Sequence, residues 1–289
     1  MNPTTTLLAN VLDRAVAILD GAGVPNARVD AELLVGHVLG LSRGGVQAKV
    51  ALDAAIGAED AVTVAGLVER RAAREPLQHI TGVAAFRNLE LAVGPGVFVP
   101  RPESELVAQY AIDALAATAN AQPIAVDLGT GSGAIALAMA TEVPHSRVYG
   151  VEVSELAFVW ALENHRRVGA DNLLLVLTDL ADALPGLTGA VDVVVSNPPY
   201  IPIGAVPRDP EVRLFDPELA LYGGADGLDV VRRVSLTARR LLHPGGQLIL
   251  EHGELQASSI AELLGHDGWR AITHHRDLLG RDRATTAVR

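Results

Sequence analysis

The stretch IAVDLGTGSGAIALAMAT, residues 124–141, contains the pattern from which the fold of this chain can be inferred. Residues 124–128 are apolar apart from one acid, which is typical of a buried strand, and residues 134–141 are rich in alanine and leucine, which is typical of a helix. The glycines between them, Gly129, Gly131 and Gly133, let the backbone pass close to a ligand and direct helix N-terminal amides at it. We therefore expect a strand, a ligand-binding loop and a helix.

The alternation of short β-branched runs with helical stretches continues to the end of the chain. It predicts an α/β fold with a mostly parallel sheet, helices on both faces, and ligands at the carboxyl ends of the strands. Expected strands lie within residues 124–129, 147–153, 173–179, 191–196, 246–253, 269–277 and 283–288, and expected helices within 134–141, 155–169, 229–242 and 257–268.

The N-terminal part has a different pattern, because Leu8, Leu12 and Leu19 recur at helical spacing and similar spacing continues to about residue 74. We expect a helical domain over residues 1–80, which either only packs or also recognises a substrate. Asp30 and Asp53 are candidate N-caps of its later helices.

A β-hairpin linker is expected over residues 81–101. AFRNLELAV at 85–93 alternates with period two, GPG at 94–96 supplies a turn, and VFVP at 97–100 resumes an extended chain. Two prolines then precede a helix expected from about Glu103 to Ala117. The remaining chain, residues 102–289, is expected to form the catalytic domain.

The composition narrows the range of partners. Lys and Arg number 23 against 34 Asp and Glu, and the net charge of -11 disfavours broad binding to nucleic acid or an anionic membrane. No cysteine is present, and the nine histidines show no metal-ligand spacing, so no metal is expected. The N-terminus does not read as a signal peptide and no window reaches transmembrane length, so a cytoplasmic protein is expected.

The acid before the glycine-rich loop bears on the ligand. Gly129, Gly131 and Ala134 fit a dinucleotide fingerprint, which keeps a nicotinamide enzyme as an alternative. Asp127, however, would face a pyrophosphate unfavourably, whereas it could pair with the ammonium of a cationic amino acid. S-Adenosylmethionine carries such an ammonium.

Two more acids end the next two strands. Glu152 is placed to accept both ribose hydroxyls, although a nicotinamide cofactor would use the same acid. Asp179 can accept from an adenine amino group while Leu180 flanks the ring. The cofactor contacts expected from these patterns are Asp127, Gly129, Thr130, Gly131, Ser132, Gly133, Glu152, Asp179, Leu180 and Asn197.

The motif SNPPY at residues 196–200 follows the fourth strand. With the acids and the loop, it resembles class I S-adenosylmethionine-dependent methyltransferases, which carry such a corner when they methylate a nitrogen held in a planar π system. That resemblance implies a Rossmann-like, seven-stranded, mostly parallel sheet. The corner serves both exocyclic amino groups of DNA bases and the side-chain amide of glutamine, so it leaves both acceptors open.

Longer stretches carry a more specific resemblance. Residues 74–107, 215–234, 244–256 and 275–283, which include REPLQHITG, PRPESE, FDPELALYGGADG, LEHGELQ and HRDLLGRDR, are similar to the HemK/PrmC glutamine methyltransferases. The chain departs from the usual pattern at His79, Ser104, Glu152 and Asp216, where Tyr, Thr, Asp and Glu are frequent. Ser104 keeps the hydroxyl and Glu152 the carboxylate, so the chemistry is preserved.

The corner suits an amide acceptor, whose nitrogen is a poor nucleophile because its lone pair is delocalised. The Asn197 side-chain oxygen and the Pro198 carbonyl can accept both N–H groups and fix the nitrogen for in-line attack. Pro199 stiffens the corner, and Tyr200 can pack beside the amide. Phe98, Arg101 and Glu103 either line the rim or are structural.

The resemblance implies methylation of a glutamine, in the GGQ motif of peptide chain release factors, by a monomer that needs no nucleic acid, membrane or metal. The alternative is an N6-adenine or N4-cytosine nucleic-acid methyltransferase, which would need a basic recognition region that the charge argues against. A third possibility, a nicotinamide oxidoreductase or a non-catalytic nucleotide-binding module, gives Asn197 and Pro198 no role.

Overall fold

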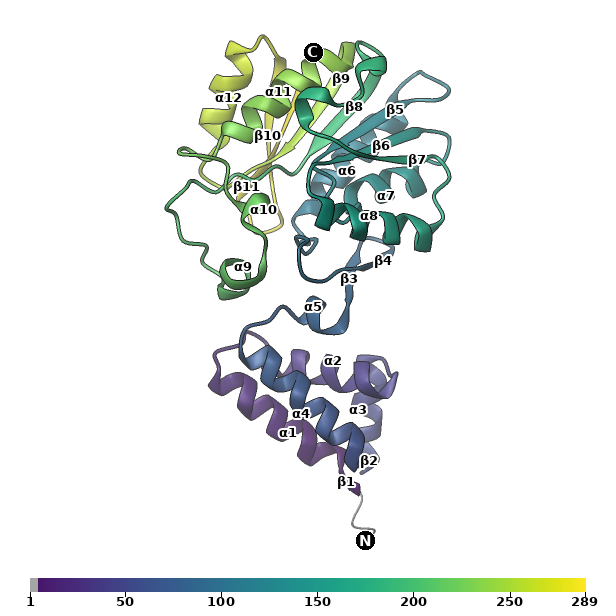
Figure 1. The fold of residues 1–289 in the computed structure, drawn as a ribbon, viewed down its shortest axis with the longest axis vertical. Coiled ribbons are helices and arrows are strands. Elements are labelled where there is room, and N and C mark those ends of the chain that lie inside the picture. Colours follow the sequence, from purple (N-terminus) through teal and green to yellow (C-terminus); the bar gives the residue numbers. More distant parts are fainter. Residues whose placement is uncertain (1–4) are drawn as a thin grey trace. The chain divides into compact units, whose positions relative to one another are not determined.

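The computed structural model describes residues 5–289 and divides the chain into two compact units (Figure 1). The helical unit contains the described residues up to Gly82 together with Arg208–Phe215. The sheet unit contains Val83–Pro207 and Asp216–Arg289. An inserted segment of the second half of the sequence therefore belongs to the first unit, which the sequence patterns did not indicate.

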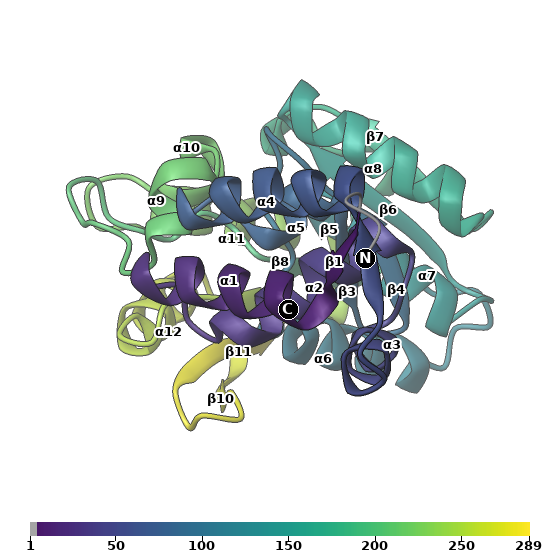
Figure 2. The same ribbon diagram turned by 90° about the horizontal axis from the view of Figure 1, so that it is seen from below.

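The helical unit confirms the helical character expected for this part. Its elements are β1 (Thr5–Leu7), α1 (Leu8–Gly21), α2 (Ala27–Leu39), α3 (Arg43–Ala51), β2 (Ala55–Gly57), α4 (Ala58–Ala72), α5 (Leu77–Thr81) and α9 (Pro210–Phe215). Helices α1 and α4 lie side by side (Figure 2), and their apolar stripes join one buried core that includes Leu12, Leu19 and Val64. The short antiparallel pair β1–β2 was not expected.

Ion pairs hold α9 in the helical unit. Glu211 pairs with Arg71 and with Arg74, each at 2.8 Å between nitrogen and oxygen. Arg71 also pairs with Asp30 at 2.7 Å, and the side chains of Arg71, Asp30 and Glu211 are largely buried. Removing one member of such a buried set leaves an uncompensated charge, so this cluster ties α9 to α2 and α4.

Both expected N-caps of the helical unit are wrong. Asp30 lies inside α2 and forms an ion pair instead of capping a helix. Asp53 has a left-handed backbone with φ of 51°, and the residue that precedes α4 is Gly57. Aspartate is favoured at caps and also in left-handed turns, and here tertiary pairing and turn geometry decide the outcome.

The hairpin is present but its turn is not the one expected. β3 (Val83–Phe86) pairs antiparallel with β4 (Leu89–Ala92), and the turn between them is Arg87–Asn88, with Arg87 at φ 52°. GPG at 94–96 follows the hairpin, and 97–100 forms no strand. The exact domain boundaries expected from sequence stay a prediction.

The sheet unit is a seven-stranded sheet in the order β10-β11-β9-β8-β5-β6-β7. Only β11 runs against its neighbours, and the pairs among β9, β8, β5, β6 and β7 are parallel. Its strands are β5 (Ile124–Leu128), β6 (Arg147–Glu152), β7 (Leu173–Leu177), β8 (Val191–Ser196), β9 (Leu242–Glu251), β10 (Arg270–Arg276) and β11 (Asp282–Val288). The expected α/β fold is confirmed.

Helices cover both faces of this sheet (Figure 1). The helices of this unit are α6 (Ser104–Ala117), α7 (Ala134–Glu142), α8 (Glu155–Val168), α10 (Glu218–Leu221), α11 (Asp229–Leu241) and α12 (Ala257–His266), with the short turns η1 (Leu180–Asp182) and η2 (Pro185–Leu187). Along β8, Val193 and Val195 pack in the core with α6 and α7, and Val194 packs in the core with α11 and α12. Burial on both faces explains the unbroken valine run of this central strand.

Candidate active site

The parallel strands bring the predicted site residues to one edge of the sheet, because their carboxyl ends meet there. Asp127 is the penultimate residue of β5, Glu152 is the last of β6, and Asp179 follows β7. Asn197 directly follows β8, which pairs with β5. The sequence placed these residues at successive strand ends, and the strand order makes those ends neighbours.

The glycine-rich loop, residues 129–133, is tied to the neighbouring strand. The amides of Gly129 and Thr130 both donate to the Val151 carbonyl, at 2.8 and 2.9 Å. Gly129 and Gly131 have positive φ and open space where a side chain would begin. The loop thus exposes backbone at the strand ends, as a loop that holds a ligand requires.

Asp127 is a buried acid with unequal oxygens. Its Oδ2 accepts from the Thr130 hydroxyl at 2.7 Å and from the Ala136 amide at 3.2 Å. Its Oδ1 is buried and has no hydrogen-bond partner among the described residues. Burial raises the pKa of Asp127 to about 7, so a cation brought next to Oδ1 would relieve an unfavourable desolvated charge.

Backbone amides orient Glu152. Its Oε2 accepts from Gly131 at 2.8 Å, and its Oε1 accepts from Val153 at 2.9 Å and Ser154 at 2.8 Å. These contacts fix the carboxylate next to the loop. Both lone pairs of Oε1 are used, and Oε2 retains one further acceptor site. A buried and oriented acceptor at this place fits the diol expected of a ribose, and that role remains a prediction.

Asp179 makes contacts within the protein that would compete with an adenine amino group, and the sequence did not reveal them. It caps η1 by accepting from the Ala181 amide at 2.9 Å, and it forms an ion pair with Arg233 of α11. Arg233 and that amide together lower the pKa of Asp179. Leu180 packs against the core under α11, and its carbonyl accepts from Thr237 at 3.1 Å.

The residues Asn197–Tyr200, called the NPPY corner from here on, are fixed through their backbone and their neighbours. The Ser196 hydroxyl donates to the Leu128 carbonyl at 2.6 Å and joins the ends of β8 and β5. Gln256 donates from its side chain to the Tyr200 carbonyl at 2.9 Å. The corner is therefore held from β5 on one side and from the loop after β9 on the other.

Two glycines of YGGADG make room for this corner. A Cβ on Gly223 would lie 2.5 Å from the Pro199 carbonyl oxygen, and one on Gly227 would lie 2.3 Å from the Tyr200 carbonyl oxygen. Gly227 also has φ of 78°. The sequence contributed this stretch only through its resemblance to a family, and the structure gives it a physical reason.

The amide nitrogen of Asn197 points toward the start of α6. Its Nδ2 donates to the hydroxyl of Ser104, the first residue of that helix, at 3.1 Å. The Oδ1 atom is thereby left as the available acceptor of this side chain. Burial raises the pKa of Tyr200, whose ring lies beside Gly253 after β9.

The three candidate rim residues are tied to other charged groups. The Arg101 guanidinium lies 5.0 Å from the Phe98 ring centre and pairs with Asp216 at 2.8 Å. Glu103 pairs with Arg281 at 3.2 Å. Structural pairing therefore accounts for the charges of Arg101 and Glu103.

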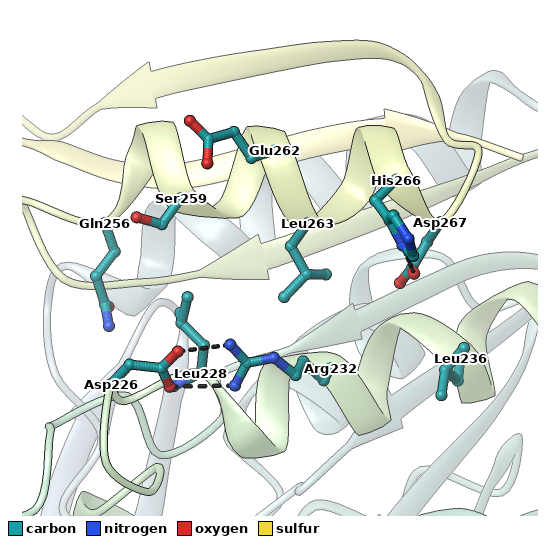
Figure 3. A pocket seen from close by; sticks show the side chains of 10 residues that line it. All are labelled: Asp226, Leu228, Arg232, Leu236, Gln256, Ser259, Glu262, Leu263, His266 and Asp267. Carbon is teal, nitrogen blue, oxygen red and sulfur yellow. Dashed lines mark hydrogen bonds and ion pairs between the residues drawn. The ribbon is translucent and has the colours of Figure 1, made fainter.

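A groove of about 610 Å³ lies elsewhere in the sheet unit, between α11 and α12 (Figure 3). Arg232 in this groove is paired with Asp226. The groove is lined by Asp226, Leu228, Arg232, Leu236, Gln256, Ser259, Glu262, Leu263, His266 and Asp267. None of the site residues expected from sequence is among them.

Residues 5–289 contain neither a metal-binding cluster nor a membrane-spanning helix. No group of histidine and acidic side chains in this part is arranged to hold a metal ion. No helix in it is long and apolar enough to cross a membrane.

The sheet order, the glycine-rich loop after the central strand and the acids at the adjoining strand ends define a class I S-adenosylmethionine-dependent methyltransferase fold. Residues 121–273 match the methyltransferase domain family, and residues 10–82 match the PrmC N-terminal domain family. A methyltransferase from Pyrococcus furiosus aligns with a TM-score of 0.51 and 23% identity over 71% of this chain and 90% of that one, which shows the fold alone.

Curated relatives match over nearly the whole length. The release factor glutamine methyltransferase of Streptomyces coelicolor is 49% identical over 97% of both chains. A 4-amino-L-phenylalanine/4-methylamino-L-phenylalanine methyltransferase of Streptomyces pristinaespiralis is 40% identical over 100% of this chain and 97% of its own. The chain belongs to the release factor glutamine methyltransferase family.

Proposed function

We propose that this protein transfers a methyl group from S-adenosylmethionine to the side-chain amide nitrogen of a glutamine in peptide chain release factors. The observation that carries the proposal is the orientation of Asn197 at the end of β8, with Nδ2 held by Ser104 and Oδ1 left to accept. Full-length similarity to release factor glutamine methyltransferases supports the same acceptor.

An amide nitrogen needs acceptors more than it needs a strong base. As it attacks, it gains positive charge and its N–H groups become stronger donors, so fixed acceptors stabilise the transition state more than the ground state. Asn197 Oδ1 and the Pro198 carbonyl supply two such acceptors. Proline at positions 198 and 199 limits the backbone freedom that binding would otherwise remove.

The residues at the sheet edge fit the cofactor. When bound, S-adenosylmethionine supplies an electrophilic methyl group on a sulfonium. The buried and unpartnered Oδ1 of Asp127 suits its ammonium, and the oriented Glu152 carboxylate suits its ribose hydroxyls. Asp179 and Leu180 would hold the adenine, and Gly129, Thr130, Gly131, Ser132 and Gly133 would line the chain between ammonium and ribose.

The proposal also covers the location of the protein, its oligomeric state and the part that recognises the substrate. We expect a cytoplasmic monomer whose helical unit, residues 1–80 with the docked α9, recognises the release factor. The net charge of -11 supports a protein partner over a phosphate backbone. The Pro-rich corner and the cofactor edge alone would also serve an adenine or cytosine amino group.

An acceptor competition tests this function. Tritiated S-adenosylmethionine is offered with a purified release factor, with DNA, or with 4-amino-L-phenylalanine, the last because of the relative at 40% identity. Label in the release factor, lost when its GGQ glutamine is replaced, is the expected result. Label only in DNA or only in the free arylamine would overturn the proposal.

The Asn197→Ala variant tests the corner within the same assay. Removing one transition-state acceptor is expected to lower kcat by on the order of 10²-fold or more. Binding of S-adenosylhomocysteine, measured by calorimetry, should change much less. Wild-type kcat in this variant would refute the assigned role of Asn197.

A further inference from the structure

Glu251, the last residue of β9, is a buried acid that the steps above do not use. It lies next to the NPPY corner, because β8 and β9 are parallel and Ser196 is in register with Leu250. Its side chain is almost completely buried, and within the described residues its Oε2 has no hydrogen-bond partner. An ionisable group in such a place is costly unless neighbouring groups stabilise it.

The neighbours of Glu251 form a chain of hydrogen bonds to the corner. The side chains of Ser104 and Asn197 lie close enough to the Glu251 carboxyl to lower its pKa as hydrogen-bond donors. A carboxylate only accepts, and the Ser104 hydroxyl has a single proton, so Ser104 donates to Glu251 and its oxygen accepts from Asn197 Nδ2 at 3.1 Å. The Nδ2 end of the Asn197 amide is thereby bound to Ser104, and the Oδ1 end is left to accept a hydrogen bond.

We propose that Glu251 is a positioning residue that, together with Ser104, holds the Asn197 amide with its oxygen toward the acceptor nitrogen. The proposal rests on the proposed function, since the orientation matters only if Asn197 accepts from the substrate. In the reverse orientation the Asn197 amino group would face the acceptor N–H groups, and two donors would meet.

The groups around Glu251 shift its pKa in both directions. Burial raises the pKa to about 7 and Glu103 adds to the rise, whereas Ser104, Asn197 and Arg283 of β11 act against it. Glu103 is itself paired with Arg281 at 3.2 Å, and the buried Tyr200 is the other titratable side chain in electrostatic contact. Serine at position 104 begins α6, whose N-terminal end favours a nearby negative charge.

The test is Glu251→Gln in the full-length protein, assayed with a release factor. The new amide can donate to Ser104, which frees the serine proton for Asn197 Oδ1 and reverses the amide. We expect kcat to fall about 10²-fold, as for other misplaced catalytic groups. The KM for the release factor and the calorimetric Kd for S-adenosylhomocysteine should change less than about threefold, because neither depends on the direction of one amide.

The pH profile adds a readout that a packing role would not produce. With saturating cofactor, wild-type kcat should fall as the pH drops through about 7, since protonated Glu251 can donate to Ser104 as glutamine does. Glu251→Gln should lose this limb. An unchanged limb in the variant would contradict the proposal.

Two further comparisons keep the inference separate from the proposed function. If Asn197→Ala is inactive while Glu251→Gln keeps wild-type kcat, only the role of Glu251 fails. If Asn197→Ala keeps wild-type kcat, the proposed clamp fails as well. In the Asn197→Ala background, Glu251→Gln should cause no further loss, and a full additional loss would overturn the role assigned here.

A second pair of variants covers the case in which Glu251→Gln does not fold. Ser104→Thr keeps the hydroxyl and should stay within about threefold of wild-type kcat, whereas Ser104→Ala should lose at least about tenfold. Equal kcat in the two variants would overturn the proposal. Glu262→Gln, an exposed acid of the α11–α12 groove, is the matched control and should leave kcat unchanged.

Discussion

Strand β8 lies between two strands that each carry a buried acid at the site, Asp127 on β5 and Glu251 on β9. Burial raises the pKa of both acids to about 7, and each keeps one oxygen without a partner among the described residues. Their contacts differ. Asp127 is held by a helix amide and Thr130 beside the glycine-rich loop, whereas Glu251 is held by Ser104 and Asn197.

We infer from this difference that the two acids belong to two halves of one site. Asp127 faces the loop that fits the cofactor, and its free oxygen can pair with a cation that arrives from outside. Glu251 faces side chains of the protein and can act on the acceptor only through Asn197. On the proposed roles, similar desolvation accompanies one cofactor-binding residue and one positioning residue.

The largest expected effect that the two acids share is on stability. Their native pKa values lie above the ordinary values of acids, so between about pH 4 and pH 7 the folded state binds more protons than the unfolded state. The contribution of each acid to the free energy of unfolding therefore falls by roughly a few kcal/mol as the pH rises through this window. Burial lowers the pKa of His252 and of His275, and their contributions change in the opposite direction.

Denaturant unfolding of the protein without cofactor, measured between pH 5 and pH 8, checks this prediction. Asp127→Asn and Glu251→Gln should each flatten the decline, and the double variant should flatten it most. Glu262→Gln, which removes an exposed acid, should retain the wild-type slope. A pH dependence that is the same in the wild type and in both variants would contradict the pKa directions of the two acids.

Cofactor affinity should separate the two acids. Asp127→Asn removes the charge that would pair with the ammonium, and we expect S-adenosylhomocysteine to bind roughly 10- to 100-fold more weakly. Glu251→Gln should bind it as the wild type does. Calorimetry at pH 8 measures both, and equal weakening in the two variants would remove the distinction drawn above.

The half of the site that contains the NPPY corner can be disturbed without a substitution at either acid. Gly227→Ala places a Cβ 2.3 Å from the Tyr200 carbonyl oxygen and strains a residue at φ 78°, so the NPPY corner must shift. We expect kcat to fall about 10-fold to 10²-fold with S-adenosylhomocysteine binding retained. Gly265→Ala, a helical glycine with open space, is the control and should be neutral or slightly stabilising.

The smallest expected effect is on cofactor affinity, and it concerns the ion pair between Arg233 and Asp179. Asp179 is the residue proposed to bind the adenine. Arg233→Ala frees Asp179 to accept from an adenine amino group, and we expect S-adenosylhomocysteine to bind about twofold to fivefold more tightly, in line with the strength of exposed ion pairs. Arg232→Ala, whose pairs with Asp226 and Asp229 are also exposed, is the matched control. Weaker binding in Arg233→Ala would show that the arginine itself assists the ligand.

The sheet and the positions of the site residues at the strand ends were predicted well from the sequence. The spacing of apolar residues and the glycines of a loop are local features of the chain, so they can be recognised without the fold. The valine run of β8 and the glycines after β5 each indicate their element directly. Helix α6 begins at Ser104, within one residue of the expected start. The hairpin turn was misplaced, since GPG resembles a turn more strongly than Arg87–Asn88 does.

The residues that the sequence did not assign act through tertiary contacts. Ser104, Gly227 and Glu251 lie in stretches that were quoted for family resemblance, yet nothing local shows that they meet the same corner. Arg233 resembles any exposed arginine of an amphipathic helix until α11 is placed beside η1. Asp30 was expected to cap a helix. Its ion-pair partner Arg71 is 41 positions away along the chain, so no local pattern indicates the pair.

The buried pairs of Glu211 with Arg71 and Arg74 have a consequence for dividing the protein into parts. The helical unit is discontinuous, and a gene fragment that ends at Gly82 encodes it without α9. Such a fragment keeps Arg74 without its acid and Arg71 with Asp30 alone, while the complementary fragment carries Glu211 without its two arginines. A chimaera that exchanges substrate-recognition parts between relatives therefore needs three junctions, after residues 82, 207 and 215, so that residues 208–215 travel with the helices.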